Sequence, residues 1–162
     1  MEVDADHVVL QGNTIVQNKW GAYLTVLASN VSFVANRVGV TADMQPAGNE
    51  VDGMYVQSDL TRIESNIIAA NGQHGLQLGE KAADPVVHDN LIGTDGSTSM
   101  GNGWDGIKCQ APRASISNTV IAANGRLGIF VLPSATDTVV SACRIGTDAT
   151  GVVAKTNKET QR

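Results

Sequence analysis

Two short phrases of this sequence recur at the same interval, and this repetition restricts the fold more than any other feature. Ile-Ala-Ala-Asn-Gly occupies residues 68–72 and again 121–125, while Ile-Gly-Thr-Asp occupies residues 92–95 and again 145–148. Both intervals are 53 residues, and the two phrases alternate along the chain. A repeat of this length predicts a solenoid in which supersecondary units stack on one another, here with two coils in each unit.

Six coils align on this repeat, and equivalent positions share a chemical character. An apolar column is followed by a column rich in asparagine and then by a β-branched column. These columns are Leu10, Phe33, Ile63, Val87, Ile116 and Val140; Asn13, Asn36, Asn66, Asn90, Thr119 and Cys143; and Ile15, Val38, Ile68, Ile92, Ile121 and Ile145. A polar turn column is predicted at Asn18, Thr41, Asn71, Asp95, Asn124 and Asp148, and a glycine column at Gly21, Gly53, Gly75, Gly106 and Gly128.

The alternation within each coil has the period of two that is typical of strands, with Leu76 and Leu78 inward and Gln77 outward. Stacking such short strands at ~4.8 Å pairs their backbone amides, so that β-branched columns pack and asparagine side chains hydrogen-bond along the stack. We therefore predict a single all-β domain over residues 1–162, a parallel β-helix (β-solenoid) with three strand faces per coil. Its coils are predicted at 7–29, 30–59, 60–84, 85–113, 114–136 and 137–154, followed by a polar tail at 155–162.

The repeated phrases resemble a known group of proteins over residues 7–150. Asn-x-Ile-x-x-Asn-Gly-x-x-Gly-Ile and Ile-Gly-Thr-Asp…Gly-Asn-Gly-x-x-Gly-Ile are similar to repeats of the right-handed parallel β-helix proteins of the pectate-lyase-like superfamily. More narrowly, they resemble the bacterial Asn-rich β-helix repeat proteins. The resemblance implies a right-handed β-helix but no single function, because the superfamily includes lyases, hydrolases, epimerases, tailspikes and adhesins.

Composition and charge exclude several other classes. The chain has 11 Lys and Arg against 16 Asp and Glu, a net charge of -5, and no basic patch that would favour a nucleic-acid partner. We expect no membrane span, because no apolar run approaches ~18 residues. We also expect no signal peptide, which leaves a cytoplasmic protein or an excised part of a secreted one. Cys109 and Cys143 are predicted to be buried free thiols.

One strand face combines aromatic and polar residues. Aromatic rings stack on the apolar faces of sugars, and neighbouring polar groups bond the sugar hydroxyls. This pattern predicts a non-catalytic module that binds a polysaccharide or surface glycan through Trp20, Tyr23, Tyr55, Gln77, Trp104, Lys108 and Phe130. Tyrosine and phenylalanine are also favoured on exposed strand faces, so a structural or assembly β-helix without a ligand is an alternative.

A second alternative is a small polysaccharide hydrolase or lyase with Asp52, His74 and Asp105 as catalytic residues. These three residues precede the glycine column in successive coils, which predicts ~9.5 Å between the two acids. That separation lies at the upper edge of the range for inverting glycosidases. Asp-Gly is also an ordinary turn signal, which would leave the acids without a catalytic role.

Metal and partner predictions follow from the same residues. Calcium is an alternative because acids occur in and near the longer loops, namely Asp43, Glu50, Asp52, Asp95 and Asp105. We nevertheless predict no metal and no cofactor, since no calcium-binding repeat spacing is present. His7 and His88 are predicted to be surface residues. Because bare ends of a β-helix expose unpaired strands, we also predict a homo-oligomer formed through the helix ends or a side face.

Overall fold

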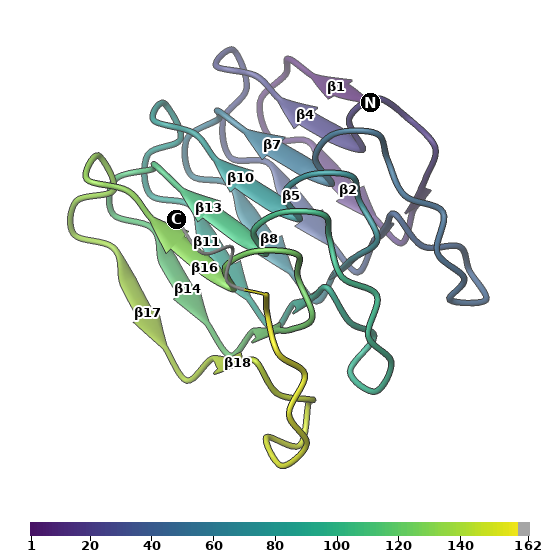
Figure 1. Ribbon diagram of the computed structural model, residues 1–162. Helices are drawn as coiled ribbons and strands as arrows, with labels where there is room; N and C mark the ends of the chain where they lie inside the picture. Colours follow the sequence, from purple (N-terminus) through teal and green to yellow (C-terminus); the bar gives the residue numbers. More distant parts are fainter. Residues whose placement is uncertain (159–162) are drawn as a thin grey trace.

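The computed structural model describes residues 1–158, in which short parallel strands wind into stacked coils (Figure 1). Its strands form three sheets of six strands each, and every strand pairs with its equivalents in neighbouring coils. All of these pairings are parallel, as in Met54–Leu76–Ile107. No helix that could cross a membrane occurs within residues 1–158. The predicted all-β parallel β-helix with three strand faces is thus confirmed.

The three sheets are named here A, B and C in the order in which a coil visits them. Sheet A contains β1 (Glu2–Val3), β4 (Ala22–Leu24), β7 (Met54–Val56), β10 (Leu76–Leu78), β13 (Ile107–Cys109) and β16 (Ile129–Val131). Sheet B contains β2 (Val9–Gln11), β5 (Ser32–Val34), β8 (Arg62–Glu64), β11 (Val86–His88), β14 (Ser115–Ser117) and β17 (Val139–Ser141). Sheet C contains β3 (Thr14–Ile15), β6 (Arg37–Val38), β9 (Ile67–Ile68), β12 (Leu91–Ile92), β15 (Val120–Ile121) and β18 (Arg144–Ile145).

The core consists of the predicted apolar columns, which point into the coil from all three sheets. Ile63 pairs with Val87 in sheet B, and Ile68 pairs with Ile92 in sheet C, in the register that the sequence predicts. These four side chains are fully buried. Each strand is too short to be stable alone, so burial of these columns against their neighbours along the stack supplies most of its stability.

A ladder of asparagine side chains lies between sheets B and C, as predicted. The Oδ1 atom of Asn66 accepts hydrogen bonds from the backbone N–H (2.8 Å) and the side-chain amide (3.2 Å) of Asn36 in the preceding coil. Asn66 in turn donates to Asn90 Oδ1 (2.9 Å) and to the carbonyl oxygen of Phe33 (2.8 Å). Each rung therefore satisfies buried backbone groups that the tight corner between the sheets leaves without strand partners.

A second asparagine ladder lies at the corner between sheets C and A, and here the predicted polar column is wrong in every second coil. The bonded series is Asn18, Asn49, Asn71, Asn102, Asn124 and Asn157. Thr41, Asp95 and Asp148 lie outside the ladder, in loops that leave the coil before the asparagine. The longer coils therefore carry their extra residues ahead of the ladder position, and the asparagine is retained in every coil.

The three inserted loops follow β6, β12 and β18 and project from the same side of the stack (Figure 1). Each loop has a neck at which its two arms are joined by an isolated antiparallel bridge. These bridges are Val40–Pro46, Thr94–Ser99 and Thr147–Ala154. Within the second loop, Asp95 Oδ1 accepts the backbone N–H groups of Ser97 (2.8 Å) and Thr98 (2.6 Å). The loop acids thus hold local turns.

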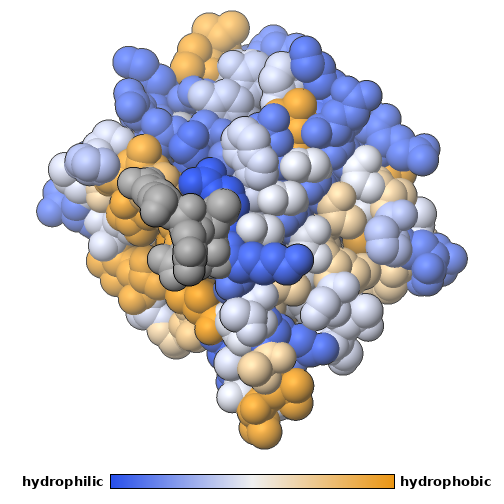
Figure 2. All heavy atoms as spheres, in the orientation of Figure 1, coloured by the Kyte–Doolittle hydropathy of each residue, from blue (hydrophilic) through white to orange (hydrophobic). Residues whose placement is uncertain are grey.

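The two ends of the stack differ from the predicted boundaries. At the first end, β1 lies ahead of the predicted first coil and pairs with β4. At the other end, Asn157 continues the second ladder although it falls in the predicted polar tail; residues 159–162 of that tail lie outside the described residues. No described coil covers the last one, so Val140 and Ile145 are 42% and 48% exposed. Figure 2 shows a hydrophobic surface over β17 at this end of the stack.

The same end position explains a difference between the two cysteines. Cys109 is a buried free thiol, as predicted, and burial raises its pKa. Cys143 is also free but only half-buried, because it belongs to the last described coil. The expectation that it is buried is therefore wrong. The homo-oligomer predicted from the bare ends stays a prediction.

Candidate functional site

The outer face of sheet A carries one row of side chains, one from each coil. The register aligns Tyr23 with Tyr55, Tyr55 with Gln77, Gln77 with Lys108, and Lys108 with Phe130. These side chains are all half-buried. The alternation of the strands puts them outward because their neighbours on both sides point into the core. This row is the framework of the candidate site.

Three aromatic rings gather at the first end of this row, and we call Trp20, Tyr23 and Tyr55 the aromatic ledge. The Tyr23 and Tyr55 rings are stacked, with centroids 5.3 Å apart and planes 7° from parallel. Trp20 lies beside Tyr23 with a centroid separation of 6.3 Å and a tilt of 40°. The Nζ atom of Lys19 lies 4.7 Å from the centroid of the Trp20 ring, within the range of a cation–π contact.

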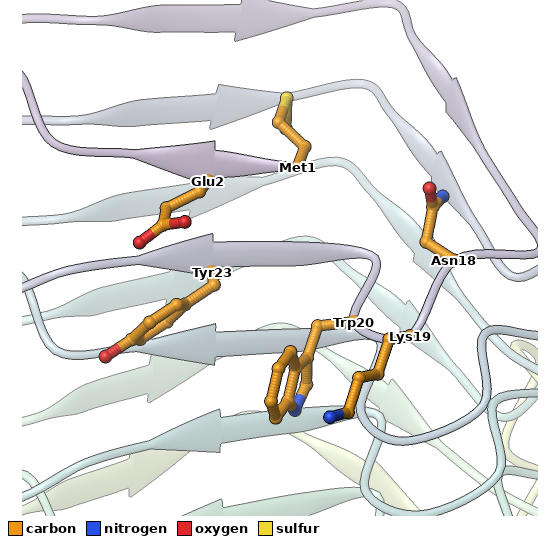
Figure 3. A pocket seen from close by; sticks show the side chains of 6 residues that line it. All are labelled: Met1, Glu2, Asn18, Lys19, Trp20 and Tyr23. Carbon is orange, nitrogen blue, oxygen red and sulfur yellow. The ribbon is translucent and has the colours of Figure 1, made fainter.

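A pocket of about 570 Å³ opens beside the ledge (Figure 3). Its lining combines two aromatic rings with one cation, one carboxylate and one amide. The lining residues are Met1, Glu2, Asn18, Lys19, Trp20 and Tyr23. Trp20 and Tyr23 were predicted as ligand-binding residues, whereas Asn18 was predicted only as a turn residue and Lys19 was not predicted. Met1 and Glu2 were not predicted because β1 lies ahead of the predicted first coil. The signal was present, since Glu2 and Val3 repeat the outward–inward alternation of Tyr23 and Leu24 with which they pair.

The middle of the row is polar and internally hydrogen-bonded. Gln77 Nε2 donates to Gln110 Oε1 at 3.2 Å, and Gln57 donates to the hydroxyl of Tyr55. The Tyr55 hydroxyl is protonated at neutral pH, as tyrosine ordinarily is, and burial raises its pKa further. The face thus offers amides and a hydroxyl next to the aromatic ledge, groups that can bond the hydroxyls of a sugar.

The predicted column of Asp52, His74 and Asp105 is present, but all three side chains are buried. Asp52 Oδ1 accepts the backbone N–H of His74 at 2.9 Å. Asp105 Oδ1 accepts the backbone N–H of Leu127 at 3.0 Å. Each carboxylate therefore joins its own coil to the next one, as the asparagines do at their corners. One oxygen of each carboxylate is therefore engaged in a structural hydrogen bond between coils.

Two further polar atoms of this group lie close together, next to the ring of Trp104. The Nδ1 atom of His74 lies 3.3 Å from Asp105 Oδ2, close enough for an ion pair but not aligned for a hydrogen bond. Trp104 meets the His74 ring edge-on, with centroids 5.2 Å apart, and is itself 41% exposed. Arg126 lies 3.9 Å from Asp105 Oδ2 and 6.0 Å from the Trp104 centroid. Arg126 was not predicted as a site residue, because it belongs to none of the repeated columns.

The pKa values of Asp52 and Asp105 are shifted in opposite directions. Burial raises the pKa of Asp52 above its ordinary value, against the hydrogen bond from the backbone of His74 and the charges of His74 and Lys108. Burial also acts on Asp105, but the close contact with the His74 ring, the N–H of Leu127 and the charge of Arg126 outweigh it. The pKa of Asp105 is therefore held below its ordinary value.

These opposite shifts predict opposite effects of two amide substitutions. Because the folded protein binds a proton at Asp52 more tightly than the unfolded chain, stability falls as pH rises from the ordinary pKa of Asp to the raised one. Asp52→Asn keeps an oxygen for the N–H of His74 and removes the buried charge. We expect it to be at least as stable as the native protein at pH 7 and to lack this decline, as measured by urea unfolding between pH 4 and 7.

Asp105→Asn is the matched control. A lowered pKa gives stability that is present above the ordinary pKa of Asp and is lost as pH falls through the lowered value. We therefore expect Asp105→Asn to be less stable than the native protein at pH 7. If Asp52→Asn lost as much stability as Asp105→Asn at pH 7, the assignment of a disfavoured charge to Asp52 would be wrong.

Comparison with known proteins places the chain in a family. A family model described as a right-handed β-helix region matches residues 42–161. The chain belongs to the right-handed β-helix family. This result confirms the resemblance seen in the repeated phrases, and it assigns the handedness of the coils. No curated protein matches the sequence.

Two solved structures share this fold. The crystal structure of the periplasmic alginate epimerase AlgG superimposes with a TM-score of 0.69 and 16% identity, covering 88% of this chain and 34% of the epimerase chain. A double mutant of that epimerase gives a TM-score of 0.65 and 17% identity, covering 88% and 35%. The chain thus spans about a third of the length of the epimerase. At this identity the similarity concerns the fold.

Proposed function

We propose that this protein is a non-catalytic β-helix module that binds a polysaccharide or surface glycan along the outer face of sheet A. The observation that carries the proposal is the pocket beside the aromatic ledge. There the Trp20 and Tyr23 rings lie next to the ammonium group of Lys19 and the carboxylate of Glu2. Aromatic walls with a few polar groups at the rim are typical of sugar-binding sites.

The shape of the face supports an extended ligand. The row continues from the pocket through Tyr55, Gln77 and Lys108, one side chain per coil. At ~4.8 Å per coil, the five steps from Glu2 to Phe130 span ~24 Å along the stack. A polysaccharide chain lying along this row would meet rings at one end and amides, a hydroxyl and the Lys108 ammonium further on. The name of the structurally similar alginate epimerase makes alginate the first polysaccharide to test.

The enzymatic alternative has less support from the geometry. A general acid or base must reach the substrate, and Asp52 and Asp105 are buried with one oxygen each engaged by a backbone N–H. The exposed aromatic and polar groups lie on the sheet face instead. The proposal is therefore confined to binding.

We expect Trp20→Ala to weaken alginate binding by about tenfold or more, because a ring stacked on a sugar contributes on the order of 1 kcal/mol beyond its buried area. Tyr23→Ala should act in the same direction, and Tyr55→Ala, at the far edge of the ledge, should weaken binding less. Isothermal titration calorimetry on the folded variants measures the effect. Leu27→Ala is the control. Leu27 is 70% exposed, lies on the turn that follows β4, the strand of Tyr23, and is outside the pocket.

Chain length and product formation are followed in the same samples. Retention of a polysaccharide without change in its chains supports the binding module. Cleavage or another reaction that is lost in Asp105→Asn, under conditions in which this variant is shown to be folded, would replace the module with an enzyme. No retention across a panel of neutral and acidic polysaccharides would contradict both readings and leave a scaffold without a glycan ligand.

A further inference from the structure

The outer face of sheet B brings together three polar side chains from three successive coils. The register aligns Glu64 of β8 with His88 of β11, and His88 with Ser117 of β14. His88 thus has a carboxylate neighbour on one side and a hydroxyl neighbour on the other. This row belongs to a different sheet from the proposed glycan-binding face, and nothing in that proposal uses it.

Asp89 completes the group through an unusual backbone conformation. Its φ of 53° lies in the left-handed region, at the tight corner that follows β11. In this conformation its Oδ2 atom lies 3.0 Å from Nε2 of His88. One ligand atom from each of Glu64, His88 and Asp89 lies within 4.8 Å of the other two. This is the only such group of three among the described residues, and none of the acids considered for calcium belongs to it.

Ser117 sets the orientation of the imidazole ring. Its Oγ atom lies 3.0 Å from Nδ1 of His88. In the tautomer that donates Nδ1–H to this hydroxyl, the lone pair is on Nε2, which faces Asp89. Histidine ligands of metal ions are commonly held in this way, with the second ring nitrogen donating to an oxygen outside the coordination shell.

The ligand set indicates the class of ion. Zinc is bound by imidazole nitrogen and carboxylate oxygen at ~2.0–2.2 Å, so two neighbouring ligands of one ion lie ~3.0–3.5 Å apart. The 3.0 Å separation of His88 Nε2 and Asp89 Oδ2 already fits this range. Calcium and magnesium prefer oxygen ligands alone and more of them. We propose that Glu64, His88 and Asp89 bind a divalent transition-metal ion of the Zn²⁺ type on the outer face of sheet B.

Arg62 is compatible with this assignment. Its Nε atom lies 2.6 Å from one carboxylate oxygen of Glu64, which leaves the other oxygen for the ion. The side chains of Glu64 and His88 are 26% and 30% exposed, so an ion reaches them from solvent without opening the fold. Bound there, the ion would join β8 to β11 across adjacent coils and stabilise the folded state relative to the unfolded chain.

The test is a titration of the full chain with Zn²⁺, followed by calorimetry and thermal unfolding. We expect one saturable site per chain and a Tm that rises with Zn²⁺ but not with Ca²⁺. His88→Gln should abolish both effects, and Asp89→Asn should weaken binding about tenfold or more. Asparagine tolerates the left-handed conformation, so the second variant changes the ligand and not the corner.

His7→Gln is the matched control, because His7 is an exposed histidine with a left-handed φ of 57° but lies outside the group. It should bind Zn²⁺ as the native chain does. The imidazole NMR signals of the native chain provide a readout without mutation, and those of His88 should shift before those of His7. Absence of saturable binding, or equal affinity in His88→Gln, would overturn the proposal.

Discussion

Asn66→Ala is expected to remove on the order of 3–5 kcal/mol from the free energy of unfolding, because it leaves buried backbone groups without partners. The Asn66 side chain accepts the N–H of Asn36 and donates to the carbonyl oxygen of Phe33, and all three residues are almost completely buried. Alanine can do neither. Since a domain has about 5–15 kcal/mol in total, much of the stability is at risk. Chemical denaturation of the purified variant measures the loss.

The first rung of the same ladder provides the control. Asn13 donates to Asn36 Oδ1 at 2.9 Å but is exposed, and no described asparagine of an earlier coil bonds to it. Water can replace its partners, so Asn13→Ala should cost less than about 1 kcal/mol. Similar losses at Asn13 and Asn66 would show that the ladder acts through local turn preference and not through buried hydrogen bonds.

Gly93→Ala should be at least as damaging, with an expected loss of about 3–5 kcal/mol or failure to fold. Gly93 has a φ of +78°, which L-residues rarely adopt. A methyl group there would also lie 2.1 Å from the carbonyl oxygen of Ala122 and 2.6 Å from Asn124 Oδ1. Both neighbours belong to the next coil, so relief would require the stack to open. Thermal unfolding and yield of soluble protein report the result.

Gly12 separates the two contributions to that loss. Its φ of +69° is similar, but a methyl group there would meet nothing within 4 Å. Gly12→Ala should therefore show only the conformational cost, about 1 kcal/mol. If both variants lost the same amount, the close approach of the coils at Gly93 would have no energetic role.

The sequence was sufficient to predict the columns of sheets B and C because apolar residues, most of them β-branched, recur at the strand positions and asparagine recurs at four of the six corner positions. The sequence was not sufficient at the corner between sheets C and A, where threonine, aspartate and asparagine are all ordinary turn residues. Chain length alone could not show on which side of the turn the extra residues were inserted. Counting back from the glycine column would have found the ladder. Asn49, Asn71 and Asn102 each stand four residues before a glycine of that column, namely Gly53, Gly75 and Gly106.

The candidate site was likewise predictable from the sequence only in part. The row of Tyr23, Tyr55 and Gln77 was predictable because strand alternation fixes which side chains point outward. The pocket was not, since it depends on a two-residue strand that lies ahead of the recognised repeat. The burial of His74 and Asp105 was also out of reach, because Trp104 and Arg126 cover them from two coils and only tertiary packing brings these groups together.

The three loop necks have a consequence for engineering. Each bridge closes its loop before the chain returns to the asparagine ladder, so the length of the loop is independent of the coil beneath it. Doubling such a loop costs only ~0.6 kcal/mol of closure entropy. Peptide epitopes grafted beyond the necks would be displayed along one wall of the stack at intervals of two coils, ~9.6 Å, without altering the core.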